Sequence, residues 1–453
     1  MSKKYELTAI DAFQSIITVL STCHQIEYIR YVNPSAVDHF SSSIISTSNN
    51  NDDPLYSSLR HLEIEMGYTE TLYENHIFKR CPNLRILRLK YARHINVSLL
   101  DSIRNHCPNL EYLSFNYHQN LIDGKDLYDQ YYPKSSTQDN SNNRTTEKVT
   151  SSSSSSSSPT LNRIYMEVEE TDHTLPFLNQ YADTIEEMGL SFKSGHQIYF
   201  ESMQPMNQLV SLAVTDIWDP FVLPTLISKL PSLRNLELYE LVTTSTELIN
   251  TLKDLNALEK LTIHSKPISF VSMGDDAHYY LERAKNHGVD LFNAYADRSM
   301  FNTTIGSSAE KKEKYTADCV SSQEQGRLTY VSLSGSEILQ DEVLEALGNI
   351  KTLSSVYIES APLLTLQGIN RFCEQLNVLP GLFSIELSDV PCVNDATLSI
   401  LGSLSMTTLS TPDVTKCITL KSLKNVTKEG LNRLVKKQGV SVIANDCLGT
   451  MYR

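Results

Sequence analysis

The sequence lacks a long apolar run. No stretch of about eighteen apolar residues occurs in its 453 residues, and a membrane-spanning helix needs a run of that length. A secretory signal is lacking too, because the apolar stretch that follows Met1–Glu6 is interrupted by Asp11 and Gln14, as in an amphipathic helix. We therefore expect a cytoplasmic or nuclear protein that does not contact membrane.

Paired cysteines and catalytic motifs are lacking as well. The eight cysteines contain no Cys-x-x-Cys pair, so we expect reduced thiols rather than a disulfide framework. No Gly-x-Gly-x-x-Gly, Walker lysine loop, His-Glu-x-x-His or Gly-x-Ser-x-Gly is present. The histidines share no metal-ligand spacing with cysteines or carboxylates. The sequence thus predicts no cofactor, no metal and no catalytic residue, and an enzyme is the least favoured class.

Positive charge is in short supply. The chain has 39 Lys and Arg against 53 Asp and Glu, a formal net charge of −14. A surface of this sign repels phosphate backbones, which disfavours nucleic acid as a partner.

What the sequence does have is a repeat. The pattern Leu-x-x-Leu-x-Leu, with Ile, Val, Met or Phe as substitutes, begins at Leu59, Leu84 and Leu110, which are 25 and 26 residues apart. Further units begin at Leu161, Ile185, Leu209, Leu233, Leu258, Leu328, Leu353 and Leu382, with weaker ones at Ile26 and Thr415. A dozen such units at a near-constant period indicate a repeat architecture.

Each repeat position has a structural role. The last two apolar residues alternate as in a short strand and should point into the core. Between the strands, 97–103, 246–252, 341–347 and 428–435 carry apolar stripes at helical spacing. The expected fold is α/β: a leucine-rich-repeat solenoid of about 12–14 repeats, a right-handed horseshoe with a concave parallel sheet and convex helices.

Details of the repeat resemble a known family. Cys81-Pro-Asn-Leu84 and Cys107-Pro-Asn-Leu110 precede strands, whereas Val393-Asn-Asp395 and Val426–Leu431 open helices. These resemble the cysteine-containing repeats of F-box proteins and of the ribonuclease-inhibitor-like superfamily. The resemblance implies that the repeats hold a protein substrate, and that an F-box recruits a Skp-type adaptor and a cullin ubiquitin ligase. An F-box needs roughly forty residues, but only Leu7–Leu20 precedes the first unit. We expect that the F-box is truncated, has diverged or was never present. The alternative to a ubiquitin-ligase role is a freestanding scaffold or regulator that sequesters a partner.

Insertions divide the chain. The expected segments are a capping helix at 1–22, repeats at 23–130, a Ser-rich disordered insertion at 131–160, repeats at 161–264, an irregular insertion at 265–325, and repeats with a cap at 326–453. The serine segment is either a phosphorylation-controlled flap or a neutral expansion. In the later insertion, Asp276–Lys285 looks helical and Gly288–Phe292 could form a short strand.

The outward strand positions predict where a partner binds. They combine hydroxyls, tyrosines and glutamates, and tyrosine is a favourable interface residue. A basic peptide is the hypothesis; ordinary solvated strand positions are the alternative. The candidates are Arg88, Lys90, Tyr165, Glu167, Glu237, Tyr239, His264, Tyr357, Glu359 and Glu386. Trp218, the only tryptophan, is either a rim anchor or a wedge between turns.

Overall fold

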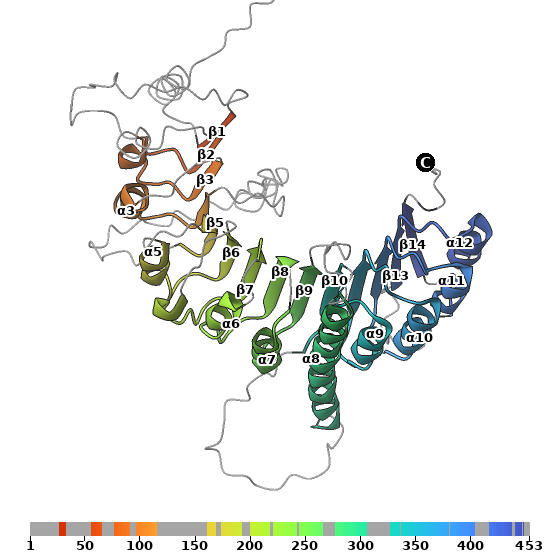
Figure 1. Cartoon of the computed structure of the whole chain (residues 1–453). Coiled ribbons are helices and arrows are strands. Elements are labelled where there is room, and N and C mark those ends of the chain that lie inside the picture. The colour runs from red at the N-terminus through yellow and green to blue at the C-terminus, as the bar shows by residue number, and fades with distance from the viewer. Residues whose placement is uncertain are drawn as a thin grey trace, which may run out of the picture. The chain divides into compact units, whose positions relative to one another are not determined.

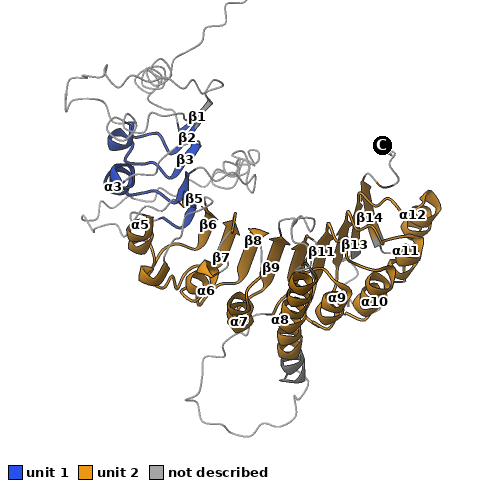
Figure 2. Cartoon of the chain, viewed as in Figure 1, with its two compact units in different colours: residues 1–167 blue, residues 168–453 orange. Residues whose placement is uncertain are grey.

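The structure is a computed structural model that divides into unit 1, residues 1–167, and unit 2, residues 168–453 (Figure 2). It describes residues 27–32, 56–65, 77–90, 97–115, 161–168, 174–192, 200–217, 221–241, 244–265, 277–305, 327–335, 337–379, 381–403, 416–436, 440–445 and 447. The expected capping helix at 1–22, the Ser-rich insertion at 131–160 and Trp218 lie outside these residues.

Unit 1 is built from parallel strands that pair in chain order. Its elements are β1 (Tyr28–Val32), β2 (His61–Glu65), the 3-10 helix η1 (Phe78–Arg80), β3 (Ile86–Lys90), α3 (Val97–His106), β4 (Tyr112–Phe115) and β5 (Arg163–Val168). Every strand pairs with the next in parallel register, so that His61 lies beside Ile86 and Ile86 beside Tyr112.

Unit 2 repeats the same alternation of strand and helix (Figure 1). Its elements are α5 (Thr174–Gln180), β6 (Glu187–Phe192), η2 (Phe200–Ser202), β7 (Ser211–Thr215), α6 (Val222–Ile227), β8 (Asn235–Leu241), α7 (Thr246–Asp254), β9 (Lys260–Ser265), α8 (Ala277–Ile305), β10 (Tyr330–Ser334), α9 (Asp341–Gly348), β11 (Ser355–Glu359), α10 (Leu366–Asn377), β12 (Ser384–Ser388), α11 (Asp395–Leu401), β13 (Lys416–Lys421), α12 (Lys428–Val435) and β14 (Val440–Asn445). Strands β6 to β14 pair in parallel in that order.

The repeat pattern explains these elements. In β8, Leu236 and Leu238 are fully buried, whereas Glu237 between them is half-buried. The same alternation in β11 and β12 turns one face of the sheet toward the helices. The other face, here called the open face, carries the outward positions. The predicted α/β leucine-rich-repeat fold is therefore confirmed, including the weak units at β1 and β13. Strand β14, which lacks the Leu-x-x-Leu-x-Leu pattern, was not predicted.

Strands of unit 2 end at a repeated backbone feature. Asp216, Glu240, Ser360, Asp389 and Ser422 have φ values of 49–56°, and each directly follows the last outward strand position. Gly335 occupies the same position at φ 104°, where a Cβ would approach the Ser265 carbonyl to 2.7 Å. From this conformation the Ser360, Asp389 and Ser422 amides each donate to the last carbonyl of the next strand at 3.0 Å. The left-handed residue thus extends the ladder while turning the chain out of the sheet.

In unit 1, turns before the strands are tied together by asparagines. Asn83 Nδ2 donates to the Ser57 carbonyl at 2.8 Å, and Asn109 Nδ2 donates to the Pro82 carbonyl at 3.0 Å. The preceding Cys81 and Cys107 are buried free thiols. Burial raises the pKa of Cys107 to about 12, so this thiol stays protonated and packs in the core. The Cys-Pro-Asn sequence is therefore a packing and linking element.

Helix N-termini in the last repeats of unit 2 are stapled to the preceding helix. Asp395 Oδ1 accepts from the Thr427 amide at 2.8 Å and Oδ2 accepts from the Thr427 hydroxyl, which in turn accepts from the Gly430 amide at 3.1 Å. Asp341, Thr365 and Gly368 repeat this arrangement between α9 and α10. A Cβ on Gly430 would lie 2.2 Å from Asp395. We call each set an Asp–Thr–Gly staple.

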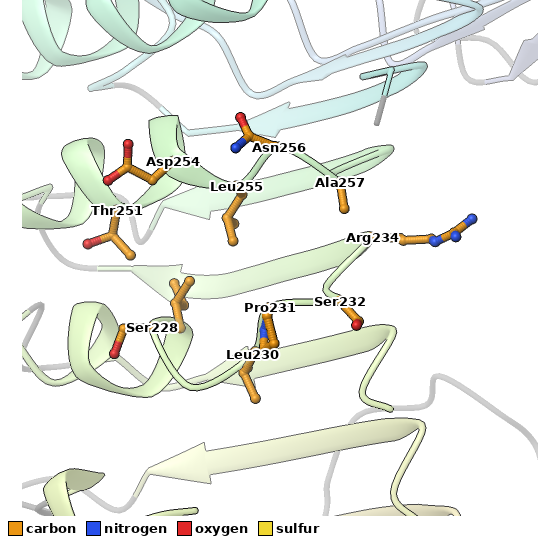
Figure 3. A pocket seen from close by; sticks show the side chains of 11 residues that line it. Ser228, Leu230, Pro231, Ser232, Arg234, Thr251, Asp254, Leu255, Asn256 and Ala257 are labelled. Atoms are coloured by element: carbon orange, nitrogen blue, oxygen red, sulfur yellow. The ribbon is translucent and has the colours of Figure 1, made fainter. Parts of the chain in front are cut away.

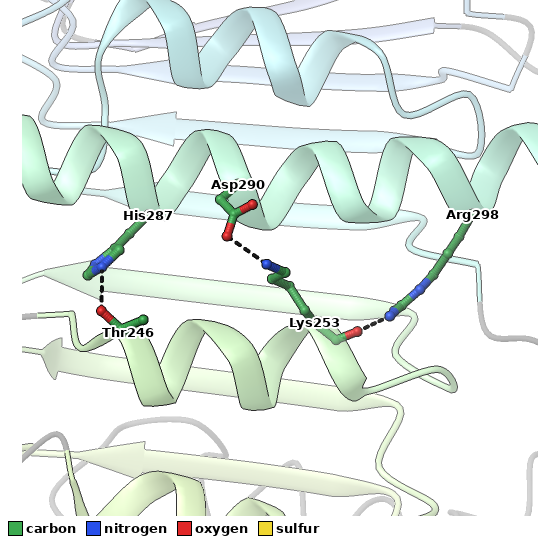
Figure 4. Close-up of polar contacts among 5 residues, drawn as sticks. All are labelled: Thr246, Lys253, His287, Asp290 and Arg298. Carbon is green, nitrogen blue, oxygen red and sulfur yellow. Dashed lines mark hydrogen bonds and ion pairs between the residues drawn. The ribbon is translucent and has the colours of Figure 1, made fainter.

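Helix α8 lies within the irregular insertion. It has 29 residues, compared with nine in α7 and eight in α9, and β9 and β10 on either side of it still pair directly. Lys253 Nζ pairs with Asp290 at 2.6 Å, His287 contacts Thr246 at 3.2 Å, and Arg298 donates to the Lys253 carbonyl (Figure 4). Gly288–Phe292 lies inside this helix, so the predicted short strand there was wrong. The apolar stripe of Ala284, Gly288, Leu291 and Tyr295 has helical spacing and outweighs the local β-propensity.

Among the described residues, no helix is long and apolar enough to cross a bilayer.

Candidate functional site

The sheet register gathers six of the predicted residues on the open face of unit 2. Glu237 on β8, Tyr357 on β11 and Glu386 on β12 belong to one row of laterally aligned positions, completed by Thr262 and Ser332. The next row places His264 beside Ser334, then Glu359, then Ser388. Tyr239 falls where β8 and β9 lose regular register, next to the left-handed Glu240.

Three rings meet at the centre of this face. The His264 ring centroid is 5.0 Å from that of Tyr239, edge to face, and 6.3 Å from that of Tyr357, stacked. His264 Nε2 lies 3.1 Å from Ser332 Oγ. Burial lowers the pKa of His264, and the charge of Glu359 only partly opposes this. The imidazole is therefore neutral at physiological pH and acts as part of an aromatic surface.

Carboxylates border the rings. Tyr239 Oη donates to Glu237 Oε2 at 2.9 Å, and burial followed by the Glu237 charge raises the pKa of Tyr239. Burial also raises the pKa of Tyr357, and a hydrogen bond to Glu359 adds to the effect. Both phenols therefore remain protonated and direct their hydroxyls at carboxylates. Glu386 Oε1 pairs with Lys421 Nζ on β13 at 2.5 Å.

Two residues on the open face of unit 2, Tyr330 and Lys421, were not among the predicted binding residues. Tyr330 begins β10, two residues before Ser332 and hence on the same face. Burial raises its pKa, with smaller contributions from Glu237 and Glu386, so the ring lies within electrostatic reach of both carboxylates. Lys421 stands two residues after Thr419. The alternation of strand positions would have found both residues had it been extended beyond the central pattern. We name Glu237, Tyr239, His264, Tyr330, Tyr357, Glu359 and Glu386 the acidic–aromatic cluster.

The chemistry of this cluster suits a cation. Ring faces attract ammonium and guanidinium groups, and adjacent carboxylates accept their hydrogen bonds. In the part of the chain that the structure describes, no three His, Cys, Asp or Glu side chains are grouped to hold a metal ion.

A pocket of 580 Å³ lies elsewhere in unit 2, between the turn that precedes β8 and the turn that precedes β9 (Figure 3). Arg234 at its edge pairs with Glu259 at 3.1 Å. The other lining residues mix small hydroxyls, Asp254 and Asn256 with apolar groups.

The remaining predicted residues lie in unit 1. Arg88 and Lys90 on β3 both pair with Glu63 of β2. Tyr165 on β5 is buried, at 5% exposure, and its ring centroid is 5.5 Å from that of Tyr112. Burial makes Tyr165 part of the sheet's packing, whereas Glu167 is half-buried on the same strand.

No protein-family model matches the sequence, and no curated protein matches it. The structure is similar to a chain of the yeast Rad7–Elc1 complex at 15% identity, covering 85% of this chain and 80% of that one, with a TM-score of 0.40. It is also similar to an internalin from Listeria monocytogenes at 13% identity, covering 72% of this chain and 81% of that one, with a TM-score of 0.30. A chain of the Drosophila Toll–Spatzle complex is similar at 12% identity, covering 84% of this chain and 41% of that one, with a TM-score of 0.34. Likeness at this level adds nothing to what the strand register itself shows about the fold.

Proposed function

We propose that the chain is a protein-binding repeat module without catalytic activity, and that the open face of unit 2 binds a basic segment of its partner. The observation that carries this proposal is the acidic–aromatic cluster on five adjacent strands, β8 to β12. Three carboxylates there face two lysines, Lys421 and the exposed Lys260 of β9 beside Tyr330, so the group keeps an excess of one negative charge. Lysine or arginine side chains would satisfy both the carboxylates and the ring faces.

The test is a comparison of two charge-matched variants. The first replaces Glu237, Glu359 and Glu386 with Gln. The control replaces the exposed helix residues Glu247, Glu345 and Glu374 with Gln, which changes the net charge equally. Each tagged full-length chain is applied to an array of Lys- and Arg-rich peptides with charge-matched scrambled and neutral peptides. We expect the first variant to lose binding at least about tenfold, and the control to bind like the unmodified chain. Equal binding by all three would contradict the proposal.

A finer proposal concerns the cellular role. The resemblance of Cys81–Leu84, Cys107–Leu110 and Val426–Leu431 to F-box-type repeats supports substrate recognition in a ubiquitin ligase, in the cytoplasm or nucleus. The alternative is a freestanding scaffold or regulator that sequesters its partner. Affinity purification of the tagged full-length chain from its own cells separates the two. Recovery of a Skp-type adaptor and a cullin would support the ligase role. One abundant partner without either would favour the scaffold.

A further inference from the structure

The open face of unit 1 differs in charge from that of unit 2. On it, Glu63 of β2 is flanked by Arg30 of β1 and by Arg88 and Lys90 of β3. Arg30 Nε lies 3.6 Å and Lys90 Nζ 3.1 Å from Glu63 Oε1, and Arg88 Nη1 lies 3.7 Å from Oε2. Three cations thus share one carboxylate, and the group carries a formal excess of two positive charges.

Burial decides which of these charges meets solvent. The Glu63 side chain is only 2% exposed, whereas those of Arg30 and Lys90 are 45% and 35% exposed. The carboxylate therefore lies beneath its cations, and a molecule that approaches this face meets the positive groups first. Coulomb attraction between exposed charges is weak, so recognition here must also use direct hydrogen bonds.

Unused hydrogen-bond donors lie at the same place. Arg88 Nε and Nη1 are buried and have no hydrogen-bond partner, although the guanidinium is ion-paired with Glu63. A buried guanidinium with unsatisfied N–H groups is costly. Arg88 Nη1 lies beneath the surface, 3.7 Å from the equally unsatisfied Glu63 Oε2. An oxyanion at this face would therefore hydrogen-bond the exposed ends of Arg30 and Lys90, and the charge of Arg88 would add to the attraction.

We propose that Arg30, Arg88 and Lys90 form a binding site for an oxyanion side chain, a carboxylate or a phosphate, in an acidic peptide segment of a partner. This inference goes beyond the proposed function and does not depend on it, because it uses unit 1 alone. Strand β5, two strands away from β3, contributes Glu167. The carboxylate of Glu167 marks the limit of the site and supplies a control.

The probes are three immobilised peptides that share a neutral sequence and differ at one central residue: serine, phosphoserine or glutamate. The full-length chain is titrated onto each peptide, at low and at physiological salt. We expect retention of the phosphoserine or the glutamate peptide over the serine peptide, with affinity that falls as salt rises. Preference between the two acidic peptides identifies which oxyanion the site takes. Equal binding of all three peptides would overturn the proposal.

The variants are chosen to keep unit 1 folded. Arg30→Gln and Lys90→Gln alter exposed groups, and each should weaken binding of the retained peptide about tenfold, as expected for a charge-assisted hydrogen bond. Arg104→Gln on α3 removes the same charge away from the site and should leave binding unchanged. Glu167→Gln removes a carboxylate two strands away on β5 and should not weaken binding. If Arg30→Gln and Lys90→Gln bind like the unmodified chain, the site does not exist.

Discussion

Glu63 in unit 1 and Glu386 in unit 2 occupy the same position, the middle of a repeat strand on the open face, yet their surroundings are opposite. Glu63 is covered by three cations and almost fully buried. Glu386 has one cation, Lys421, and its side chain is 24% exposed among carboxylates and tyrosines. One repeat position can therefore be either an internal ion-pair centre or part of an acidic surface. The neighbouring strands decide which.

Replacing each glutamate by leucine gives the sharpest test of this contrast. Glu63→Leu leaves Arg88 buried without a counter-charge, which should lower the free energy of unfolding of unit 1 by about 3–5 kcal/mol. Glu386→Leu breaks a partly exposed pair and should cost at most about 1 kcal/mol. Hydrogen exchange of the β2 and β12 peptides measures the two effects locally. The double variant Glu63→Leu with Arg88→Leu should recover much of the loss, and equal costs at the two sites would refute the contrast.

The histidines of the two open faces, His61 in unit 1 and His264 in unit 2, differ in their surroundings. His61 is fully buried against the Tyr28 ring, at 4.4 Å between centroids, and neither ring nitrogen has a hydrogen-bond partner. Burial lowers the pKa of His61 to about 4, with Glu63 opposing and Arg88 assisting the shift. The unfolded chain has the higher pKa, so the stabilisation is complete above about pH 6.5 and is lost as the pH falls toward about 4.

Lowering the pH from about 7.5 to about 5 should reduce the free energy of unfolding of unit 1 by about 2 kcal/mol, because His61 takes up a proton in the unfolded chain but not in the folded one. His61→Phe keeps the ring and removes the titration, so the variant should lose that much less stability over the same range. Urea unfolding of both proteins at the two pH values measures the difference. The same pH dependence in chain and variant would show that His61 does not titrate on unfolding.

In unit 2 the phenols should matter more for binding than for folding. Tyr239→Phe and Tyr357→Phe remove hydroxyls directed at carboxylates. Each variant should bind a basic peptide roughly fivefold more weakly, a loss of about 1 kcal/mol. Tyr279→Phe, on an α8 side chain that is 64% exposed, is the matched control. Titration of a fluorescent Lys-rich peptide reports the change. Loss of affinity in the control variant alone would place the binding site elsewhere.

The smallest expected effect concerns Lys421. Lys421→Met breaks only a partly exposed ion pair and should alter stability by less than about 0.5 kcal/mol. Because it releases Glu386, we expect about twofold tighter binding of the same peptide. Weaker binding would mean that Lys421 itself contacts the partner. In unit 1 the corresponding loss of Lys90 should weaken, not strengthen, binding of an acidic peptide.

The sequence pattern predicted the strands well because core spacing is local. The spacing of Leu236 and Leu238 alone predicts β8, and the apolar stripe of Thr246–Leu252 at helical spacing predicts α7. The environment of a glutamate between two leucines is not local. Glu63, Glu237 and Glu386 look alike in the repeat, and only the register of neighbouring strands shows that Arg30 and Arg88 flank the first. Strand β14 was missed because Val440, Val442 and Ala444 alternate without leucine.

The Asp–Thr–Gly staples have a consequence for how the last repeats come apart. In a linear repeat array each unit depends on its neighbours for stability. Thr427 caps α12, but Asp395 of the preceding helix holds that threonine in place. Undocking α12 therefore also removes its own cap, so helix formation and docking occur together. The repeat that contains α12 should therefore detach as a unit rather than residue by residue.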